Sequence, residues 1–562
     1  MQGRRLAAIL CAVALGLSAC GPDAGKSPEA QASTGGATSG PSPSATPAAR
    51  VVLRLAANTQ AGGYPTPYAA IRGPGRLMTT FMFDALAYPD ISGQPRPWLA
   101  KSWESSADGK TWTFHLVEGV KWTDDQPLTA DDVVFTFDYN LKGPGAETGV
   151  AQGITYIDSV TAPDPATVVI QLNSVRPSFL SDITGPFGVA VMPRHIWESV
   201  QDPAHFQGAQ AFIGSGPYVL REFDQTTNSF DFVANDDFYL GPPVVQELQI
   251  FPAGDPLLAL QQGELSAAST GNAAIPQAQF DTLSQKFKLL TAAGEFNEAL
   301  FFNLAGGFPY DEVDFRQAVA YALDRQDMLD RLVGSRGVPG SAGGLGPANP
   351  FLDPTLPDYA FDLSKAGALL DKIGLTDRNG DGTRDLPDGS AFTIELLTSA
   401  SDNAQAGLVK EYLRSAGLAV AITSVDQPTS DARDTAGDYE MAIVHVGGLS
   451  GDPSGLISRF DSTSKSKSFT RVYGYKNERF DQLAAKQATT LDPAQRRVLV
   501  EQMQAILAAD LPQLSLYVPE QTSFVDTRQY AGWGYTPGCP PCGAALNKRM
   551  LLTGSAEPVP ED

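Results

Sequence analysis

Histidine and cysteine are the scarcest residues in this sequence, with four of each among 562 residues. No two histidines have the spacing of paired metal ligands; they stand at His115, His195, His205 and His445. The serines form no complete catalytic motif. Ser401-Asp402-Asn403 precedes the S-x-x-K match at residues 462–465, the reverse of the β-lactamase order, and no Lys-Thr-Gly follows. These absences predict a protein that is not an enzyme and uses no cofactor.

Basic residues are also few, with 40 Lys and Arg against 63 Asp and Glu and a formal net charge of −23. Nucleic-acid binding requires a basic surface that neutralises phosphates, so this charge excludes it. The chain is 43% hydrophobic and 18% charged, as in ordinary globular proteins. Its length is enough for at least two hydrophobic cores.

Near the N-terminus, the apolar run at residues 6–17 is too short to span a bilayer comfortably. Arg4 and Arg5 precede it, and Leu17-Ser18-Ala19-Cys20-Gly21 closes it. This pattern resembles a bacterial lipobox and predicts that residues 1–20 are a lipoprotein signal with Cys20 as the lipidated residue. Acyl chains would then hold the protein on the outer face of the cell membrane. A plain secretory signal is the alternative.

Residues 21–50 contain no Val, Ile, Leu, Met or aromatic residue. Such a segment cannot bury a core, so we expect a disordered tether. Cys11 would leave with the signal, and Cys539 and Cys542 then remain as a C-P-P-C pair. In an oxidising compartment a local disulfide between them is the preferred interpretation, with a thioredoxin-like redox site as the alternative.

The region from residue 100 to residue 137 combines strand and helix patterns. Trp112, Phe114 and Leu116 alternate with polar residues, which predicts a half-buried strand at residues 111–116. A turn at Glu118-Gly119 would lead to a return strand from residue 120, and the pair would form a hairpin. Thr129 with Asp132 three residues later is typical of a capping box at a helix start.

Within this region AKSW, DGKTWTFHL, GVKW and LTADDVVFTF follow one another. Their order resembles the signature of the family 5 extracellular solute-binding proteins, the peptide- and nickel-type receptors of ATP-binding cassette importers. Gly214-Ser215-Gly216-Pro217-Tyr218 resembles a further family element, and so does the strand–loop–helix pattern at residues 298–325. Asp125 stands where the family usually has glycine.

The resemblance implies a two-lobed α/β fold of the periplasmic-binding-protein type, in its large three-subdomain form, with a hinge and a ligand cleft between the lobes. Residues 51–310 would form the first lobe, with an inserted subdomain at about residues 90–210. Residues 311–507 would form the second lobe. Within it, the residue spacing predicts a helix at residues 362–373 with Asp362 as its cap, and strand–helix–strand alternation predicts a βαβ unit at residues 392–425. Residues 508–555 would return to the first lobe, and residues 556–562 would be a tail.

A binding receptor needs a cleft with convergent polar groups and aromatic walls. The candidates for ligand contact lie on the first loop, at a strand end and in the loop after residue 445: Asn58, Thr59, Tyr64, Phe302, Asn303, His445, Val446, Leu449 and Asp452. Peptide-binding members of the family usually place Trp and Asp where this chain has Val446 and Leu449. That Asp would hold the peptide's α-ammonium group, so its absence argues against peptide binding through this pairing.

Asp377, Asn379 and Asp381 match the first half of a calcium-binding loop. The twelfth position is Asp388 instead of Glu, and a strand follows. An Asx-rich turn without metal is therefore preferred, with calcium as the alternative.

The resulting functional hypothesis is a monomeric, membrane-anchored receptor that captures an oligopeptide or related solute and delivers it to the permease subunits of an importer. Two alternatives stay open. One is a receptor for a nickel or other metal chelate, and the other is a regulatory or scaffolding lipoprotein derived from the family.

Overall fold

The computed structural model describes residues 50–57, 64–69, 73–90, 94–147, 154–185, 188–269, 275–292, 294, 296–447, 451–464, 468–534 and 548–554. The described residues all lie within one compact unit, residues 50–562. Cys20, Cys539 and Cys542 lie outside the described residues, so lipidation and the disulfide stay predictions. Among the described helices, none is long and apolar enough to cross a bilayer.

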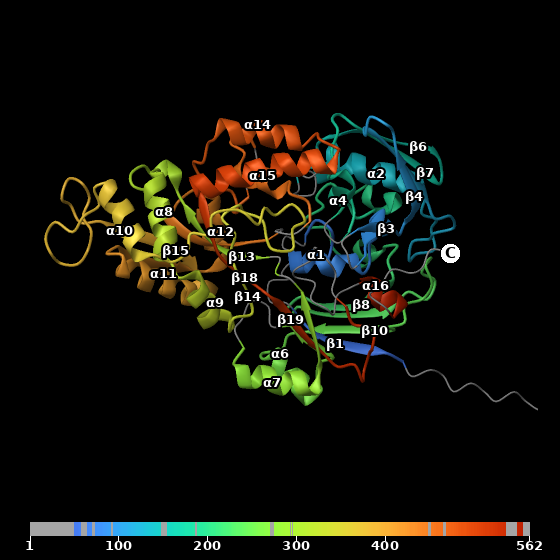
Figure 1. The fold of residues 1–562 in the computed structure, drawn as a ribbon. Coiled ribbons are helices and arrows are strands. Elements are labelled where there is room, and N and C mark those ends of the chain that lie inside the picture. The colour runs from blue at the N-terminus through green and yellow to red at the C-terminus, as the bar shows by residue number, and fades with distance from the viewer. Residues whose placement is uncertain are drawn as a thin grey trace, which may run out of the picture. The chain divides into compact units, whose positions relative to one another are not determined.

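The first lobe is built on a seven-stranded sheet with the order β12-β19-β11-β1-β10-β9-β8 (Figure 1). Leu53 and Leu55 alternate on β1 toward a core that also contains Phe232 and Leu248. Helices α1 (Gly73–Thr80), α6 (Pro256–Gln262) and α7 (Gln277–Lys286) belong to this part of the chain. The strands are β1 (Val52–Ala56), β8 (Tyr218–Asp224), β9 (Ser229–Ala234), β10 (Glu247–Phe251), β11 (Ala267–Ser269), β12 (Lys288–Ala292) and β19 (Gln521–Val525).

A smaller four-stranded sheet, with the order β4-β5-β7-β6, has a core of its own within the segment expected to be inserted. Phe114, Trp122 and Phe137 are buried in this core. Its elements are β4 (Ala100–Ser105), β5 (Thr111–Leu116), β6 (Ile157–Asp164), β7 (Thr167–Leu172), α2 (Ala130–Leu141) and α4 (Phe179–Ile183). The short strands β2 (Ala87–Pro89) and β3 (Pro95–Pro97) pair nearby in the sequence, and α5 (Arg194–Trp197) packs against α2.

The predicted strand at β5 and the predicted helix start are confirmed, but the hairpin pairing is wrong. β5 pairs with the preceding β4 and with β7, while Lys121 makes only an isolated bridge to Pro127. The reason is that Val120 and Trp122 turn into the apolar core instead of forming a strand edge. At the helix start, the Thr129 amide donates to Asp132 Oδ2 at 2.9 Å. Asp125 has a φ of 67°, the left-handed conformation for which the family's usual glycine is suited.

The second lobe contains a six-stranded sheet with the order β14-β18-β13-β17-β15-β16. Leu300 and Phe302 of β13 belong to one core, and Ala299 and Phe301 belong to the other, so both faces of the sheet are covered. The strands are β13 (Asn297–Phe302), β14 (Gly337–Pro339), β15 (Thr393–Ser399), β16 (Ala419–Val425), β17 (Met441–Val446) and β18 (Gln513–Pro519).

Helices α8 (Val313–Ala322), α9 (Arg325–Val333), α10 (Leu363–Lys372) and α11 (Asn403–Ser415) contribute to the first of these cores. The second core includes residues of α13 (Gly455–Phe460), α14 (Glu478–Gln487) and α15 (Pro493–Asp510), and α12 (Gln427–Ala436) contacts β15. β15 and β16 are parallel and joined by α11, which confirms the predicted βαβ unit. Asp362 caps α10 as its sequence predicted, because its carboxylate accepts the Ser364 and Lys365 amides.

Two segments carry the chain between the two large sheets. β12 leads into β13, and β18 leads through Glu520 into β19. Near both crossings the segments pack backbone against backbone, since a Cβ on Gly294 would lie 2.1 Å from the Pro519 carbonyl oxygen. Sheet membership therefore places the crossings between β12 and β13 and between β18 and β19. β13 and β18 belong to the second-lobe sheet, although the ranges expected from the sequence, 51–310 and 508–555, assigned them to the first lobe.

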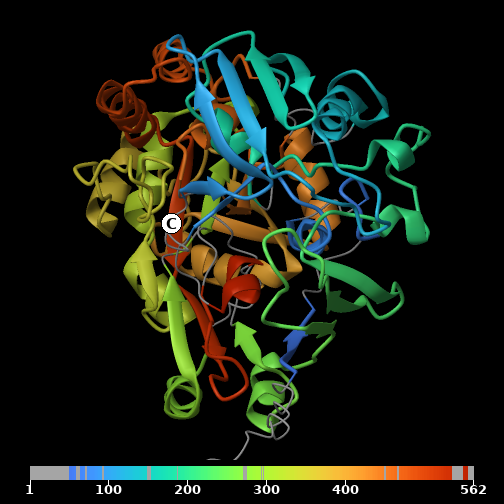
Figure 2. The ribbon, with the colours of Figure 1, turned by 90° about the vertical axis from the view of Figure 1, so that its right-hand side faces the viewer.

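The C-terminal helix α16 (Lys548–Thr553), the short red helix in Figure 2, is held to the first lobe by a buried ion pair. The Lys548 ammonium donates to Asp84, and the two side chains are 1% and 0% exposed. Trp98 Nε1 donates to the same carboxylate at 2.8 Å, and the Ser215 and Tyr239 hydroxyls donate to its other oxygen. Burial lowers the pKa of Lys548, and Asp84 acts against this shift.

Lys548→Met should destabilise the protein by about 3–5 kcal/mol, because it leaves the Asp84 carboxylate buried without its countercharge. Chemical denaturation monitored by tryptophan fluorescence measures the change. Lys142→Met is the matched control: its ammonium is 64% exposed and lies 2.7 Å from Asp138. An exposed pair contributes at most about 1 kcal/mol, so equal losses in the two variants would contradict this role for the buried pair.

Candidate functional site

The candidate ligand contacts at strand ends lie at opposite ends of the second-lobe sheet, with Phe302 and Asn303 at one end and His445 and Val446 at the other. β13 and β17 are antiparallel, with Asn297 opposite Val446 and Phe302 opposite Met441. Five residue steps along a strand separate Phe302 from Asn297, which is about 17 Å. The structure thus brings His445 and Val446 together at one end and leaves Phe302 and Asn303 at the other.

The side chains of Phe302 and Asn303 contact other parts of the second lobe. Phe302 is fully buried and its ring contacts that of Phe315, with centroids 6.4 Å apart. Asn303 accepts the Ala305 amide and donates to the carbonyl oxygens of Gly437 and Tyr439. Their polar and aromatic groups are therefore used to join β13 to the end of α12.

Tyr64 lies in the first lobe, where its ring stacks on Phe212 at 5.1 Å and its hydroxyl accepts the Gly208 amide. Val446 is fully buried in the apolar core on the α14–α15 side. Asn58, Thr59 and Leu449 lie outside the described residues.

At the other end of β13, a cluster of polar side chains collects on the face that α11 covers. Glu298 lies opposite His445 on β17 and opposite Tyr517 on β18. His445 Nδ1 is 2.8 Å from Glu298 Oε1. Asp402, at the N-cap position of α11 but without a side-chain capping bond, accepts the Ser399 hydroxyl at 2.5 Å. The cluster lies where β15 and β17 end, and the carboxyl ends of parallel strands are the common position of ligand sites in α/β sheets.

Burial and mutual charge govern protonation in this cluster. Burial raises the pKa of Asp402, and the Glu298 charge raises it further. Burial opposes the charged form of His445, but the charge and hydrogen bond of Glu298, together with the charge of Asp402, raise its pKa above the ordinary value. The pKa of Tyr517 is raised by burial and by both carboxylates.

Sequence reasoning selected His445 but missed Glu298, Asp402 and Tyr517 as its neighbours. A signal for Glu298 was present, since a carboxylate opens the otherwise apolar strand Ala299-Leu300-Phe301-Phe302. Asp402 was considered only as part of the Ser401-Asp402-Asn403 match. Nothing local linked these positions, because Glu298 and His445 are 147 residues apart.

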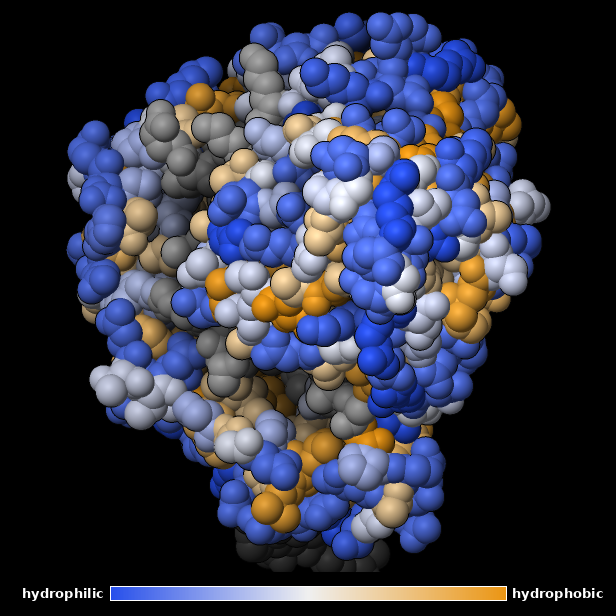
Figure 3. All heavy atoms as spheres, turned by 90° about the vertical axis from the view of Figure 1, so that its left-hand side faces the viewer, coloured by the Kyte–Doolittle hydropathy of each residue, from blue (hydrophilic) through white to orange (hydrophobic). Residues whose placement is uncertain are grey.

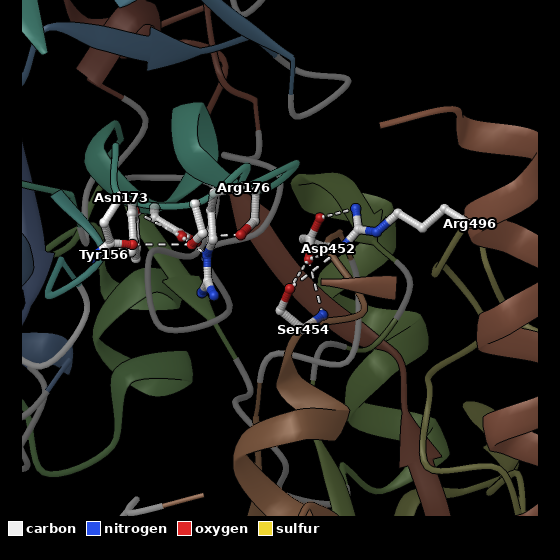
Figure 4. A network of polar contacts seen from close by, with 9 residues as sticks. Tyr156, Asn173, Arg176, Asp452, Ser454 and Arg496 are labelled. Carbon is white, nitrogen blue, oxygen red and sulfur yellow. Dashed lines mark hydrogen bonds and ion pairs between the residues drawn. The ribbon is translucent and has the colours of Figure 1, made fainter. Parts of the chain in front are cut away.

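The Asp452 carboxylate pairs with Arg496 of the protein itself and not with an ammonium group of a ligand. Its two carboxylate oxygens lie 2.6 and 2.9 Å from the Arg496 guanidinium nitrogens, and the Ser454 amide donates to Oδ1 (Figure 4). Burial would raise the pKa of Asp452, but the hydrogen bonds and charge of Arg496 outweigh it and lower the pKa. This carboxylate therefore stabilises a turn against α15.

Figure 4 also shows a network around Arg176 in the inserted sheet region. Arg176 Nε and the Tyr156 hydroxyl both donate to Asp182 Oδ2 at 3.0 Å, and the guanidinium lies 4.7 Å from the Tyr156 ring centre. Burial raises the pKa of Asp182 although Arg176 opposes the shift. The Arg176 charge is thus engaged by the first lobe itself.

In the loop at residues 377–383 the side-chain oxygens bind the loop's own amides. Asp377 accepts the Gly380 and Gly382 amides, Asn379 accepts that of Asp381, and Asp381 accepts that of Thr383. Hydrogen bonds from Thr383 lower the pKa of Asp381. This is the Asx-turn geometry. Across the described ranges, no group of three or more His, Cys, Asp or Glu side chains is arranged to hold a metal ion.

Two cavities are separate from the polar cluster. One, beside Arg76 and Lys548, has about 20 Å³, room for a single water molecule. The other is a surface hollow of about 570 Å³ between α14 and α15. The face on the α8 and α10 side is mainly hydrophilic, with small separate apolar areas (Figure 3).

Comparison with known proteins identifies relatives for most of the chain. The family model "Bacterial extracellular solute-binding proteins, family 5 Middle" matches residues 94–468. The nickel-binding periplasmic protein of Escherichia coli is 26% identical over 67% of this chain and 72% of its own length. Di/tripeptide-binding protein 4 of Pseudomonas aeruginosa is 29% identical, over 77% of this chain and 83% of its own.

Solved structures show the same fold. The oligopeptide-binding protein AppA of Bacillus subtilis, in complex with a nonapeptide, superposes with a TM-score of 0.74 at 22% identity, covering 87% of this chain and 97% of its own. NikA of Brucella suis, in complex with Fe(III)-EDTA, has a TM-score of 0.73 at 20% identity over 88% of this chain and 98% of its own. The two-lobed α/β fold predicted from the sequence is therefore confirmed.

Asp452→Asn should destabilise the protein by about 2–3 kcal/mol at neutral pH, because Arg496 would keep its buried charge without a carboxylate. A lowered folded-state pKa contributes stability that is present above the unfolded value of about 3.9 and is lost as pH falls through the folded value. The difference between wild type and variant should therefore shrink below about pH 4. Urea denaturation across pH measures it, and a difference that does not change with pH would contradict the assignment.

Proposed function

Because the chain belongs to family 5 of the bacterial extracellular solute-binding proteins, we propose that it is a lipid-anchored receptor that captures a small solute by lobe closure and delivers it to the permease of an ATP-binding cassette importer. Family members are binding receptors, so the chain is a solute-binding protein and not an enzyme. The proposed solute is an oligopeptide or a related compound.

The observation that carries this proposal is the connection between the two large sheets. Only two described strand crossings link them, and the crossings lie side by side at Gly294 and Pro519. A pair of adjacent strands of this kind is a suitable hinge, since small backbone rotations there rotate two rigid cores. Arg336 supports the same junction by donating to the Ile275 carbonyl oxygen at 2.9 Å and lying 4.8 Å from the Phe280 ring centre.

The ligand surface proposed from the sequence combines Asn58, Thr59 and Tyr64 of the first lobe with His445, Leu449 and Asp452 of the second. Val446 was expected there too, but it is fully buried in the apolar core and does not belong to this surface. Among the described members, His445 is the one whose charge and exposure suit direct contact, since its side chain is 32% exposed. Tyr64 offers an aromatic wall. Asp452 acts behind this surface by fixing the loop through Arg496.

Relatives with different named ligands support different solute classes. A di/tripeptide-binding relative supports a peptide-like solute, and a nickel-binding relative supports a metal chelate as the second candidate. In the part of the chain that the structure describes, no three ligating side chains converge. A metal would therefore have to arrive inside its own chelator, which is why the organic solute is preferred.

Full-length protein isolated from its own envelope in mild detergent should carry the solute, which native mass spectrometry would release and identify. Returning that solute at about 100 times its Kd should stabilise the protein by about 2.7 kcal/mol. Small-angle scattering should show a smaller radius of gyration in the bound form, because the lobes close. A protein that carries no solute and never compacts would favour the scaffolding alternative.

Cys20→Ala should release the protein from the membrane fraction, because no acyl chain would then be attached. Fractionation of cells followed by intact-mass measurement tests this. Cys11→Ala is the matched control, since it lies inside the expected signal and should leave membrane attachment unchanged. Equal membrane attachment of the Cys20→Ala and wild-type proteins would contradict lipidation.

A further inference from the structure

One oxygen of the buried Glu298 carboxylate has no hydrogen-bond donor among the described residues. The side chain is 2% exposed, and Oε1 is 2.8 Å from His445 Nδ1. Oε2 is buried and receives no hydrogen bond from the described part of the chain. An unsatisfied buried polar atom costs about 1–3 kcal/mol, and more when it is charged. This oxygen is therefore suited to a donor that comes from outside the chain.

The charges that face this oxygen are mainly negative. β17 contributes His445, β18 contributes the Tyr517 phenol, and the start of α11 contributes Asp402. The cluster thus contains two carboxylates, Glu298 and Asp402, and one imidazole, His445. The cluster keeps a net negative charge whether the imidazole is neutral or protonated, and this charge favours a cation.

The cluster is open to solvent on one side. His445 is about one-third exposed at the end of β17, and the Phe296 ring lies 4.3 Å from its ring, at the crossing from β12. Tyr517 closes the inner side and is 1% exposed. Aromatic rings beside a cation add favourable cation–π attraction. The cluster is thus negatively charged, bordered by the Phe296 and Tyr517 rings, and next to the proposed hinge.

A bare metal ion does not suit this cluster, because no three ligating side chains among the described residues are arranged to hold one. A cation that brings its own N–H donors does suit it, since an ammonium group has three donors and no acceptor. We propose that Glu298, with Asp402 beside it, forms a subsite for a primary ammonium group of the captured solute. This inference rests on the receptor function proposed above and specifies the solute as an amine-bearing compound.

Paired probes test the subsite. Trialanine and cadaverine would be titrated into the full-length protein by calorimetry beside N-acetyl-trialanine and N,N′-diacetylcadaverine, which carry no ammonium group. A charge-assisted hydrogen bond predicts about 10- to 100-fold tighter binding of the better amine than of its acetylated partner. Affinity should fall from about pH 7 to about pH 5, because protonation of His445 adds positive charge and protonation of Asp402 removes negative charge, while the probe amines stay charged over this range.

Glu298→Gln should abolish the preference for the amine while leaving the melting temperature close to that of wild type, and Asp402→Asn should reduce it. Asp434→Asn is the matched control. Asp434 is also buried, at 3% exposure, and its Oδ1 has no donor in the described residues, but it lies on α12 away from the cluster. The preference should be unchanged in this control. Equal binding of amine and acetylated probes by wild type, or a preference that survives in Glu298→Gln, would overturn the subsite.

If no probe binds, the solute released from the wild-type protein decides the question. A solute without a cationic nitrogen, or a cationic solute that Glu298→Gln still retains, overturns the subsite but leaves the receptor function intact. A cationic solute that Glu298→Gln loses and Asp434→Asn keeps supports it. If no solute is found at all, the receptor function itself fails.

Discussion

The rest of this structure depends on one constraint, which is the pair of adjacent chain segments that run from one large sheet into the other. β13 and β18 are neighbours in the second-lobe sheet, and they continue into β12 and β19, which are neighbours in the first. At the junction, Gly294 packs so closely on Pro519 that no side chain fits between them. The ends of β13, β17 and β18 therefore meet beside the crossing. Side chains at those ends therefore lie next to the proposed hinge.

The buried carboxylates of the two lobes differ in how completely their oxygens are paired. In the first lobe, the Asp84 carboxylate receives Lys548 and three further donors, and this joins α16 to residues more than 460 positions earlier. In the second lobe, Asp452 is matched by both arms of Arg496. Glu298 is matched on one oxygen only. Asp434 on α12 also has an oxygen without a donor among the described residues, so the position of Glu298 beside His445 and Asp402 at the strand ends is what distinguishes it.

The relation between family and ligand follows from the same arrangement. The elements that resemble the family, such as the capped helix α2 and the strand–loop–helix unit of β13 and α8, build cores and junctions. Relatives that share these elements are named for nickel, di/tripeptides and oligopeptides. A common scaffold thus carries different sites. The chemistry that selects a solute resides in the few side chains at the strand ends and loops.

The sequence by itself determined the local elements and the scaffold. Helical spacing predicted α8 and α10, strand–helix–strand alternation predicted the parallel pair β15 and β16, and Asp362 was recognised as a cap, because each pattern is complete within about 30 residues. The hairpin return at residue 120 was misjudged, since the neighbours of β5 are chosen by core packing rather than by turn proximity. Only the tertiary structure decided the polar cluster. Glu298, Asp402, His445 and Tyr517 come from four elements, and β-sheet register, a property of long-range pairing, sets them on one face.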